Sequence, residues 1–340
     1  MTNSIEIELR VQALRAYMRE KGLQAFIFPS TDPHCGEYVP DHWMTRKWIS
    51  GFDGSAGTAV VTLEDAALWT DSRYFLAAAE QLSGTPFCLM KDGLEDTPTI
   101  SQWLSRTVQS SKPKVQSPGI SINPLGATGE ASLTVGVDGW VNTMADVRGL
   151  REELAKAGLQ LCIGGDPADE LWENRPNIPT NPIEIQPLEY AGETCQSKIT
   201  RLRKALQQTG AEGTVVSQLD EIAWLLNLRG TDVHCNPVFV AYLLLTQTEA
   251  NLFTNSEKIT PEVASYLREN NIDTIPYSAI TEALKTYKGN TIFLDPKTSN
   301  WNLQASIPES CNVVENNSLI APMKAIKNEA EIRGFRNAKI

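Results

Sequence analysis

The sequence contains no apolar run that could cross a membrane, for which about 18 or more consecutive residues are needed. Its first residues, MTNSIEIELR, are polar and acidic, whereas a secretory signal begins with basic residues followed by an apolar stretch. We therefore expect neither a membrane span nor a signal peptide, and we expect a cytoplasmic protein.

Residues that commonly bind metals are few and scattered. The chain has three histidines and six cysteines, and no two cysteines form a C-x-x-C pair, which argues against a zinc knuckle. No H-E-x-x-H motif is present. His34 and His42 have acidic neighbours, so a loop metal site is one interpretation, but solvated loop histidines are the ordinary case. We predict no metal ligand in this chain and a reducing compartment.

Positive charge is also in short supply. The chain has 30 Lys and Arg against 41 Asp and Glu, a formal net charge of -11. Nucleic acids and anionic membranes both bind basic surfaces, so neither is an expected partner. Hydrophobic residues make up 41% of the 340 residues, which indicates a globular protein long enough for two domains.

The sequence lacks the common nucleophile and phosphate-binding motifs. There is no G-x-S-x-G, and the run Gly54–Gly57 lacks the P-loop lysine and precedes a strand, so a tight turn is the simpler prediction. The acidic pairs are expected to be solvated or capping residues; they are Glu64–Asp65, Asp169–Glu170 and Asp220–Glu221. The sequence therefore predicts no catalytic residue and no complete active site in this chain.

The most informative stretch is WISGFDGSAGTAVVTLEDAALWTDSRY, residues 48–74. Gly51, Gly54 and Gly57 permit sharp turns or close backbone approach. Two strands are expected after them, at 58–62 and 66–70, joined by an acidic turn.

A helix is expected over 73–82, with Asp71 or Ser72 as its cap. This places Arg73 in the first turn of the helix, where a cation opposes the helix macrodipole. Either Arg73 is a solvated surface residue, or it is held there to meet an anion or a carbonyl.

Helices alternate with strands through the first half, which predicts an α/β fold. The helix over 5–21 has an apolar face that includes Leu9, Leu14 and Met18 and ends before Gly22. The other expected elements are helices from Thr97 to Val108 and over 143–157, and strands at 25–28, 87–90, 119–122, 134–137 and 161–163. Prolines and glycines over 164–188 predict an extended linker.

The second half repeats this order, which predicts an internal duplication. Trp224–Gly230 aligns with Trp48–Gly54. Aligning Thr254 with Thr70 places Glu257 opposite Arg73, and a slip of one residue would place Lys258 there instead. The expected elements are helices at 194–208, 261–270 and 278–287, strands at 213–217, 238–246, 250–254, 273–277, 291–295 and 312–315, and a helical run from Pro322.

Several motifs together resemble the three-domain, cytosolic-type Xaa-Pro aminopeptidases (aminopeptidase P). They are Thr31–His34, Trp48–Thr58, Leu68–Phe75, Asp220–Gly230 and Asn236–Val238, with a tail at Lys324–Ile340 similar to the opening helix of the catalytic domain. The resemblance implies two tandem creatinase-N-like (ribonuclease H-like) domains, each a mixed sheet flanked by helices. The implied order is domain I at 1–165, a linker at 166–188, domain II at 189–322, and the first helix of a pita-bread catalytic domain at 323–340.

The family removes the N-terminal residue from peptides with proline in second position, using two divalent metals, typically manganese. By this resemblance the ligands would follow Ile340, so the present chain would be inactive alone and would hold no cofactor. The expected partners are proline-containing peptides and a second copy in a homodimer. The family's Asp-Gly-Arg-Tyr motif matches residues 71–74, with Ser72 in place of glycine, and implies that Arg73 binds substrate. The alternatives are a prolidase- or creatinase-type hydrolase and a non-enzymatic peptide-binding module.

Overall fold

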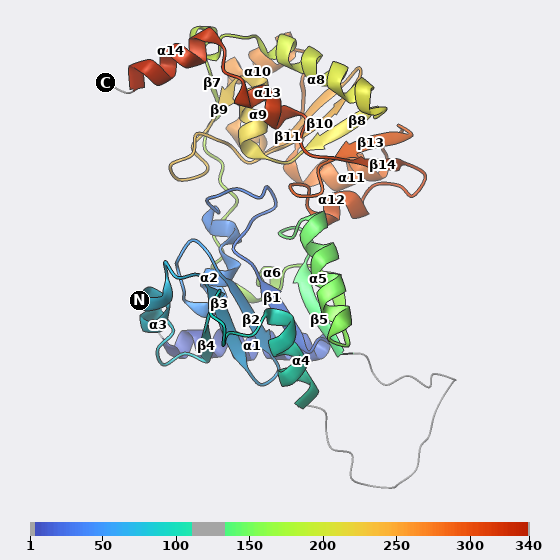
Figure 1. The fold of residues 1–340 in the computed structure, drawn as a ribbon. Coiled ribbons are helices and arrows are strands. Elements are labelled where there is room, and N and C mark those ends of the chain that lie inside the picture. The colour runs from blue at the N-terminus through green and yellow to red at the C-terminus, as the bar shows by residue number, and fades with distance from the viewer. Residues whose placement is uncertain (1–3, 111–132, 339–340) are drawn as a thin grey trace. The chain divides into compact units, whose positions relative to one another are not determined.

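The computed structural model describes residues 4–110 and 133–338. The chain forms two compact units (Figure 1). Unit 1 is formed by the described parts of residues 1–30, 44–138 and 147–175, and unit 2 by those of 31–43, 139–146 and 176–340. The strand expected at 119–122 lies outside the described residues. Within the described ranges, no helix is long and apolar enough to cross a membrane.

Unit 1 is built on a six-stranded mixed sheet with the order β4-β3-β2-β1-β5-β6. The central strand β1 is antiparallel to β2 and parallel to β5, and β3 is antiparallel to β2 and parallel to β4. The strands are β1 (Ala25–Phe28), β2 (Thr58–Thr62), β3 (Ala66–Thr70), β4 (Phe87–Lys91), β5 (Leu133–Asp138) and β6 (Leu159–Gly164).

Both faces of this sheet are buried, as the alternation along β1 shows. Phe26 and Phe28 pack in one apolar cluster with helix α1, whereas Ile27 packs in a second cluster with Leu104 and Leu154. Successive side chains of a strand point to opposite faces, so each face needs its own helical cover. The helices are α1 (Ser4–Glu20), α2 (Thr45–Ser50), α3 (Phe75–Gln81), α4 (Ile100–Ser110), α5 (Met144–Lys156) and α6 (Ala168–Leu171).

Helix α1 illustrates how sequence spacing translates into burial. Its buried residues are Ile7, Val11, Leu14 and Met18, spaced three or four apart, which is the repeat of one helix face. Leu9, expected on that face, is 60% exposed, so this assignment was wrong.

Unit 2 contains a second six-stranded sheet with the order β12-β11-β10-β8-β13-β14. Each pairing has the direction of its counterpart in unit 1, with β8 in the place of β1 and β10 in the place of β2. The predicted duplication is therefore confirmed. The strands are β8 (Gly213–Val216), β10 (Tyr242–Thr246), β11 (Ala250–Thr254), β12 (Asp273–Pro276), β13 (Thr291–Leu294) and β14 (Asn312–Glu315).

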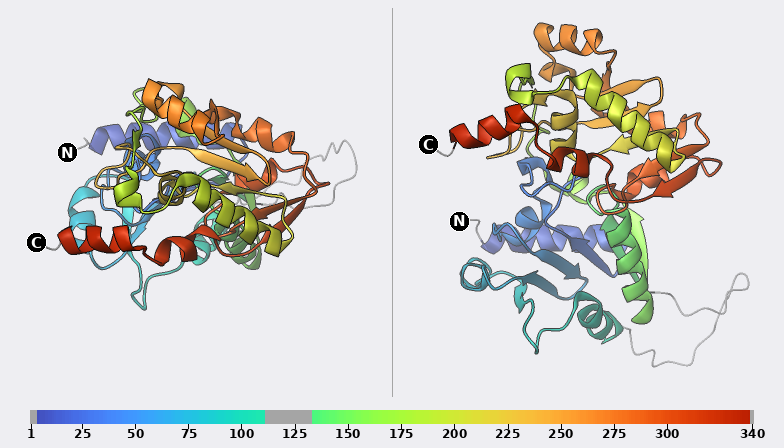
Figure 2. Two further views of the ribbon diagram at one scale, coloured as in Figure 1. Left: turned by 90° about the horizontal axis from the view of Figure 1, so that it is seen from above. Right: turned by 45° about the horizontal axis from the view of Figure 1, so that its top comes forward.

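The sheet of unit 2 is also covered on both faces (Figure 2). Val216 packs in one cluster with residues of α8, α9 and α10, and Val215 packs in another with residues of α11 and α12. The helices are α7 (Leu188–Ala191), α8 (Cys195–Thr209), α9 (Leu219–Leu226), α10 (Pro261–Glu269), α11 (Ile280–Lys285), α12 (Trp301–Ala305), α13 (Ile320–Ala325) and α14 (Glu329–Ala338), and a small sheet pairs β7 (Glu184–Ile185) with β9 (Leu228–Arg229).

Two sequence predictions need correction here. The proline-rich stretch 164–188 is not extended throughout, because α6 forms within it and α7 begins at Leu188. The helical run expected from Pro322 is two helices, since residues 326–328 interrupt it between α13 and α14. Local propensity does not decide whether a short helix forms within 164–188 or whether the helical run breaks at 326–328. Contacts with distant residues decide both.

Candidate functional site

The Asp71–Tyr74 turn contains the predicted substrate-binding residue Arg73. Asp71 Oδ1 accepts a hydrogen bond from the backbone N–H of Arg73 at 3.0 Å, and Tyr74 N donates to Asp71 O at 3.0 Å. Helix α3 begins only at Phe75. The prediction that Arg73 lies in the first helical turn was therefore wrong, because the aspartate side chain closes a turn of its own before the helix.

The Arg73 side chain is exposed and oriented by a single carboxylate. Its Nε donates to Asp71 Oδ1 at 2.9 Å and its Nη2 to Asp71 Oδ2 at 2.7 Å. The side chain of Arg73 is 65% exposed. Hydrogen bonds from Arg73 lower the pKa of Asp71. Within the part of the chain that the structure describes, Asp71 is the only hydrogen-bond partner of this guanidinium, so Nη1 remains able to donate to another molecule.

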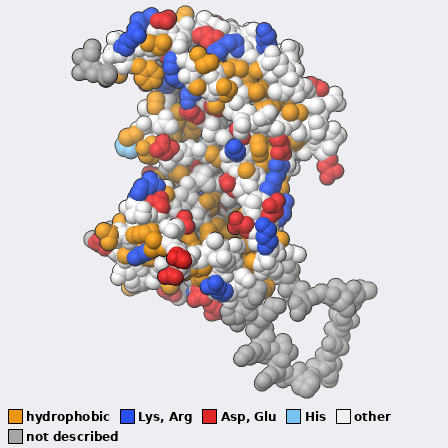
Figure 3. Space-filling view, in the orientation of Figure 1, with side chains coloured by type: hydrophobic (Ala, Val, Ile, Leu, Met, Phe, Trp, Pro, Cys, Tyr) orange, Lys and Arg blue, Asp and Glu red, His pale blue; other side chains and the backbone are white. Residues whose placement is uncertain are grey.

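The glycine-rich loop before β2 lies beside this turn. A hydrogen bond of 2.6 Å joins Ser55 Oγ to the Tyr74 hydroxyl, and Thr70 Oγ1 donates to Ala56 O at 2.7 Å. Gln81 of α3 exchanges two hydrogen bonds with Asp53, at 3.1 and 2.7 Å. Over the α3 end of unit 1, Figure 3 shows apolar side chains next to basic and acidic ones. The loop is thus fixed to the two elements that bound the Arg73 turn.

Three side chains, those of Arg46, Phe52 and Tyr74, connect the loop to Arg73. Arg46 of α2 lies over the Phe52 ring, 4.8 Å from its centroid, and Phe52 meets Tyr74 edge to face at 5.9 Å. The Arg73 guanidinium lies over the Tyr74 ring, with Cζ 5.2 Å from the ring centroid. Sequence reasoning missed Arg46 because nothing in its neighbours marks it as buried, yet it is only 7% exposed.

The turn in unit 2 that corresponds to Asp71–Tyr74 settles the alignment of the repeats. Asn255 Oδ1 accepts from the backbone N–H of Glu257 at 2.9 Å, just as Asp71 does from Arg73. The first alignment is therefore confirmed, with Glu257 opposite Arg73. Lys258 then corresponds to Tyr74 and is buried in an ion pair with Asp232.

The histidines do not form a metal site. His34 is 1% exposed, its Nδ1 donates to Ser217 O at 2.9 Å, and its Nε2 accepts from the Tyr277 hydroxyl at 2.8 Å. Burial lowers the pKa of His34 to about 3. The prediction of a solvated loop histidine was wrong for His34, since distant residues of unit 2 enclose it. Among the described residues, no group of three His, Cys, Asp or Glu side chains could hold a metal ion.

One of the three acidic pairs also differs from the prediction. Glu221 is 5% exposed and accepts a hydrogen bond of 2.6 Å from Ser318 Oγ. Burial raises its pKa to about 7. Asp220, its neighbour, instead forms an ion pair with Lys324. These groups join α9 to the segment around α13 rather than forming an acid/base pair.

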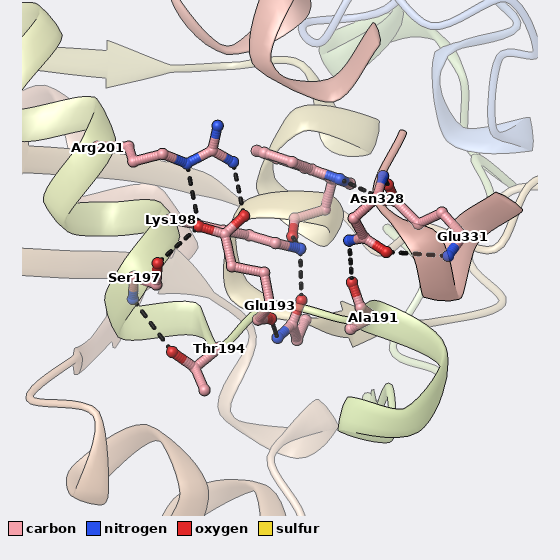
Figure 4. A network of polar contacts seen from close by, with 10 residues as sticks. Ala191, Glu193, Thr194, Ser197, Lys198, Arg201, Asn328 and Glu331 are labelled. Atoms are coloured by element: carbon pink, nitrogen blue, oxygen red, sulfur yellow. Dashed lines mark hydrogen bonds and ion pairs between the residues drawn. The ribbon is translucent and has the colours of Figure 1, made fainter. Parts of the chain in front are cut away.

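A second polar cluster surrounds the buried Lys198 in unit 2 (Figure 4). Its Nζ donates to Trp224 O at 2.8 Å and to Asn227 Oδ1 at 2.7 Å, and it lies 4.2 Å from a Trp224 ring centroid. Burial lowers the pKa of Lys198 to about 8. Trp224 Nε1 donates to Glu331 Oε1 at 3.0 Å, which extends the cluster to α14.

Asn328 and Glu331 form a capping box at the start of α14. Asn328 N donates to Glu331 Oε2 at 2.9 Å, and Glu331 N donates to Asn328 Oδ1 at 3.0 Å. Asn328 Nδ2 also donates to Ala191 O at 2.8 Å (Figure 4). The cluster fixes the start of α14 against α7 and α9.

Comparison with known proteins assigns the class of both repeats. Residues 10–164 and residues 174–331 each match a family of creatinase/prolidase N-terminal domains. Two mixed sheets flanked by helices agree with this assignment. The chain belongs to the creatinase/prolidase N-terminal domain family, whose domain it contains twice.

Two relatives of the whole chain are named as probable Xaa-Pro aminopeptidases P. The chain is 39% identical over 342 residues to a probable Xaa-Pro aminopeptidase P from Aspergillus clavatus, covering 97% of this chain and 48% of the relative. It is 37% identical over 352 residues to one from Ajellomyces capsulatus, covering 99% and 53%. The chain therefore spans about half the length of the curated relatives it matches.

A solved structure gives the same result at the level of the fold. The X-prolyl aminopeptidase from Caenorhabditis elegans, described as a cytosolic enzyme with a di-nuclear active site, matches with a TM-score of 0.83 and 30% identity. The match covers 99% of this chain and 54% of that structure.

Proposed function

We propose that this chain is the N-terminal, non-catalytic region of a metallo-aminopeptidase that removes the N-terminal residue from peptides with proline in second position. The observation that supports this most strongly is the likeness of both repeats, over 97% of the chain, to a probable Xaa-Pro aminopeptidase P. Single-domain relatives such as prolidases would explain one repeat, whereas the confirmed duplication favours the aminopeptidase P arrangement.

Arg73 is the residue that we propose contacts substrate. Its bidentate pairing with Asp71 fixes the plane of the guanidinium and leaves Nη1 available. Because the pair is neutral as a whole, its remaining donor suits a neutral acceptor better than a carboxylate. We therefore assign to Arg73 a hydrogen bond to a peptide carbonyl beyond the proline.

The metal chemistry belongs to the part of the enzyme outside this chain. The Caenorhabditis elegans relative is described as having a di-nuclear active site. We propose two divalent ions, with manganese as the metal, which would activate the attacking water and stabilise the developing charge. By the same likeness we propose a cytoplasmic enzyme that forms a homodimer.

The test compares this chain with a longer form of the protein that continues past Ile340. Both are incubated with manganese and an Xaa-Pro-Pro peptide, and release of the first residue is measured. We expect turnover by the long form and none by residues 1–340 alone. Turnover by the short chain would contradict the non-catalytic assignment. Absence of turnover by a metal-loaded long form would contradict the aminopeptidase assignment.

A further inference from the structure

Arg46 is a buried cation that forms no ion pair with any residue that the structure describes, although the charge of Asp53 acts on it. Its Nη1 donates to Phe52 O at 3.0 Å and its Nη2 donates to Gly54 O. Its Nε has no hydrogen-bond partner among the residues that the structure describes. Burial lowers the pKa of the guanidinium to about 10. Burying a charge without a counter-charge opposes folding, and the two hydrogen bonds to loop carbonyls offset part of that cost.

The second repeat shows that this position does not require an arginine. Helices α2 and α9 each end in a left-handed residue, Gly51 at φ 78° and Asn227 at φ 52°, which aligns the two helices. Ile222 then corresponds to Arg46 and is fully buried. In the same alignment Leu228 corresponds to Phe52, and the unit 2 turn has Lys258 and Glu257 in place of Tyr74 and Arg73.

Four of the residues that differ between the repeats, Arg46, Phe52, Tyr74 and Arg73, form a chain of contacts in unit 1. Arg46 binds the carbonyls of the loop and covers one face of Phe52, Phe52 packs edge to face on Tyr74, and Tyr74 supports Arg73. These contacts link the buried guanidinium of Arg46 to the exposed guanidinium of Arg73.

We propose that Arg46 is a positioning residue for Arg73: it fixes the Phe52–Gly54 backbone, and through the Phe52 and Tyr74 rings it sets where the Arg73 guanidinium meets the peptide. This inference rests on the proposed function. Arg46 binds the carbonyls of Phe52 and Gly54. Phe52 packs on the Tyr74 ring, and Gly54 precedes Ser55, which is hydrogen-bonded to the Tyr74 hydroxyl. Without the guanidinium, the loop can shift, and small displacements of a binding group strongly reduce its effect in the transition state.

The kinetic test uses the long form of the enzyme and two substrates, an Xaa-Pro dipeptide and an Xaa-Pro-Pro tripeptide. In the tripeptide the carbonyl of the first proline is part of a further peptide bond, whereas in the dipeptide it belongs to the C-terminal carboxylate. In Arg46→Ile, which introduces the residue found in unit 2, we expect kcat/KM for the tripeptide to fall about tenfold and that for the dipeptide to change little. Arg46→Lys should restore part of the loss.

Two comparisons separate positioning from general stability. In Arg15→Ile, the matched control, an arginine of α1 that donates to Thr62 O at 3.0 Å is removed, and the preference for the tripeptide should persist. The double variant Arg46→Ile/Arg73→Ala should have the same kcat/KM for the tripeptide as Arg73→Ala alone. Both substitutions act on the same interaction, the contact of Arg73 with the substrate. Equal losses for both substrates, or additive losses in the double variant, would overturn the proposal.

A further measurement does not depend on activity. Phenylglyoxal reacts with arginine side chains in their neutral guanidine form. Mass spectrometry of residues 1–340 measures the rate at which Arg73 is modified. We expect Arg46→Ile to raise that rate several-fold and Arg15→Ile to leave it unchanged. An unchanged rate in Arg46→Ile would overturn the proposal even if the enzyme proves active. If Arg73→Ala alone has no kinetic effect while labelling responds as expected, the substrate role of Arg73 fails and the coupling of Arg46 to Arg73 stands.

Discussion

Asp71 and Asn255 occupy equivalent positions in the two repeats, and each accepts a side-chain hydrogen bond from the backbone N–H two residues further on. The shared turn therefore does not depend on the residue that donates, which is Arg73 in unit 1 and Glu257 in unit 2. Since the geometry is conserved while the charge is reversed, the difference between the repeats lies in what the turn presents to solvent.

Replacing Arg73 should weaken catalysis without weakening the fold. Arg73→Ala in the long form removes an exposed donor, so we expect kcat/KM for an Xaa-Pro-Pro peptide to fall about tenfold, near the lower range for a hydrogen bond to a charged group. The free energy of unfolding should change by less than about 0.5 kcal/mol. Arg19→Ala, at an exposed arginine of α1, is the control. Wild-type kinetics in Arg73→Ala would show that Arg73 is a surface residue without a role in substrate binding.

Gly54 should tolerate no side chain. A Cβ there would lie 2.3 Å from Phe52 Cζ and 2.8 Å from Tyr74 Cδ1, so Gly54→Ala must displace a ring. We expect a loss of about 1–3 kcal/mol in the free energy of unfolding, measured by urea titration.

The control for this variant is Gly149→Ala. Gly149 lies in α5, and a Cβ there would meet nothing within 4 Å. Alanine is the better helix former by about 0.5–1 kcal/mol, so this control should be slightly stabilising. If Gly54→Ala were equally stabilising, the close packing of the loop against the two rings would be disproved.

The buried pair of Lys258 and Asp232 should be sensitive to loss of either partner. Both side chains are fully buried, and Asp232 also accepts from Val240 N at 2.7 Å. Lys258→Met leaves a buried carboxylate without its counter-charge, so we expect unit 2 to lose about 3–5 kcal/mol of unfolding free energy.

Two further variants test this explanation by chemical denaturation. Adding Asp232→Asn to Lys258→Met should recover part of the stability, because the remaining charge is then removed. Lys204→Met, at an exposed lysine of α8, should have little effect. A loss in the double variant as large as in Lys258→Met would show that packing, and not the unpaired charge, is responsible.

Glu221 should make the stability of unit 2 depend on pH. Burial raises its folded pKa from 4.5 to about 7, with smaller contributions from Asp220 and Asp295 that raise it and from Ser318 and Lys324 that lower it. A carboxyl with a raised folded pKa binds its proton more tightly in the folded state. Its contribution is therefore full below about pH 4.5 and is lost as the pH rises through about 7.

Glu221→Gln isolates this effect. The amide keeps an acceptor for Ser318 but cannot ionise, so the stability of the variant relative to wild type should rise between pH 5 and 8 by on the order of 2–3 kcal/mol. Glu262→Gln, at an exposed glutamate of α10, should show no such change. Parallel pH profiles for Glu221→Gln and wild type would contradict the assignment.

The sequence by itself determined the secondary structure where local signals agree. Strands β2 and β3 were predicted at their observed bounds because β-branched and apolar residues lie between clear turn residues. The duplication followed from a repeated order of such signals, and Arg73 was marked by its motif before its geometry was known.

Tertiary structure alone decided which polar residues are buried. His34 is enclosed by Ser217 and Tyr277, and Glu221 meets Ser318, all far away in the sequence. Arg46 binds carbonyls close by in sequence, but its burial depends on the packing of α2 against the rest of unit 1. Local patterns report propensity and amphipathicity over a few residues, whereas the environment of a side chain depends on segments that meet only when the chain folds.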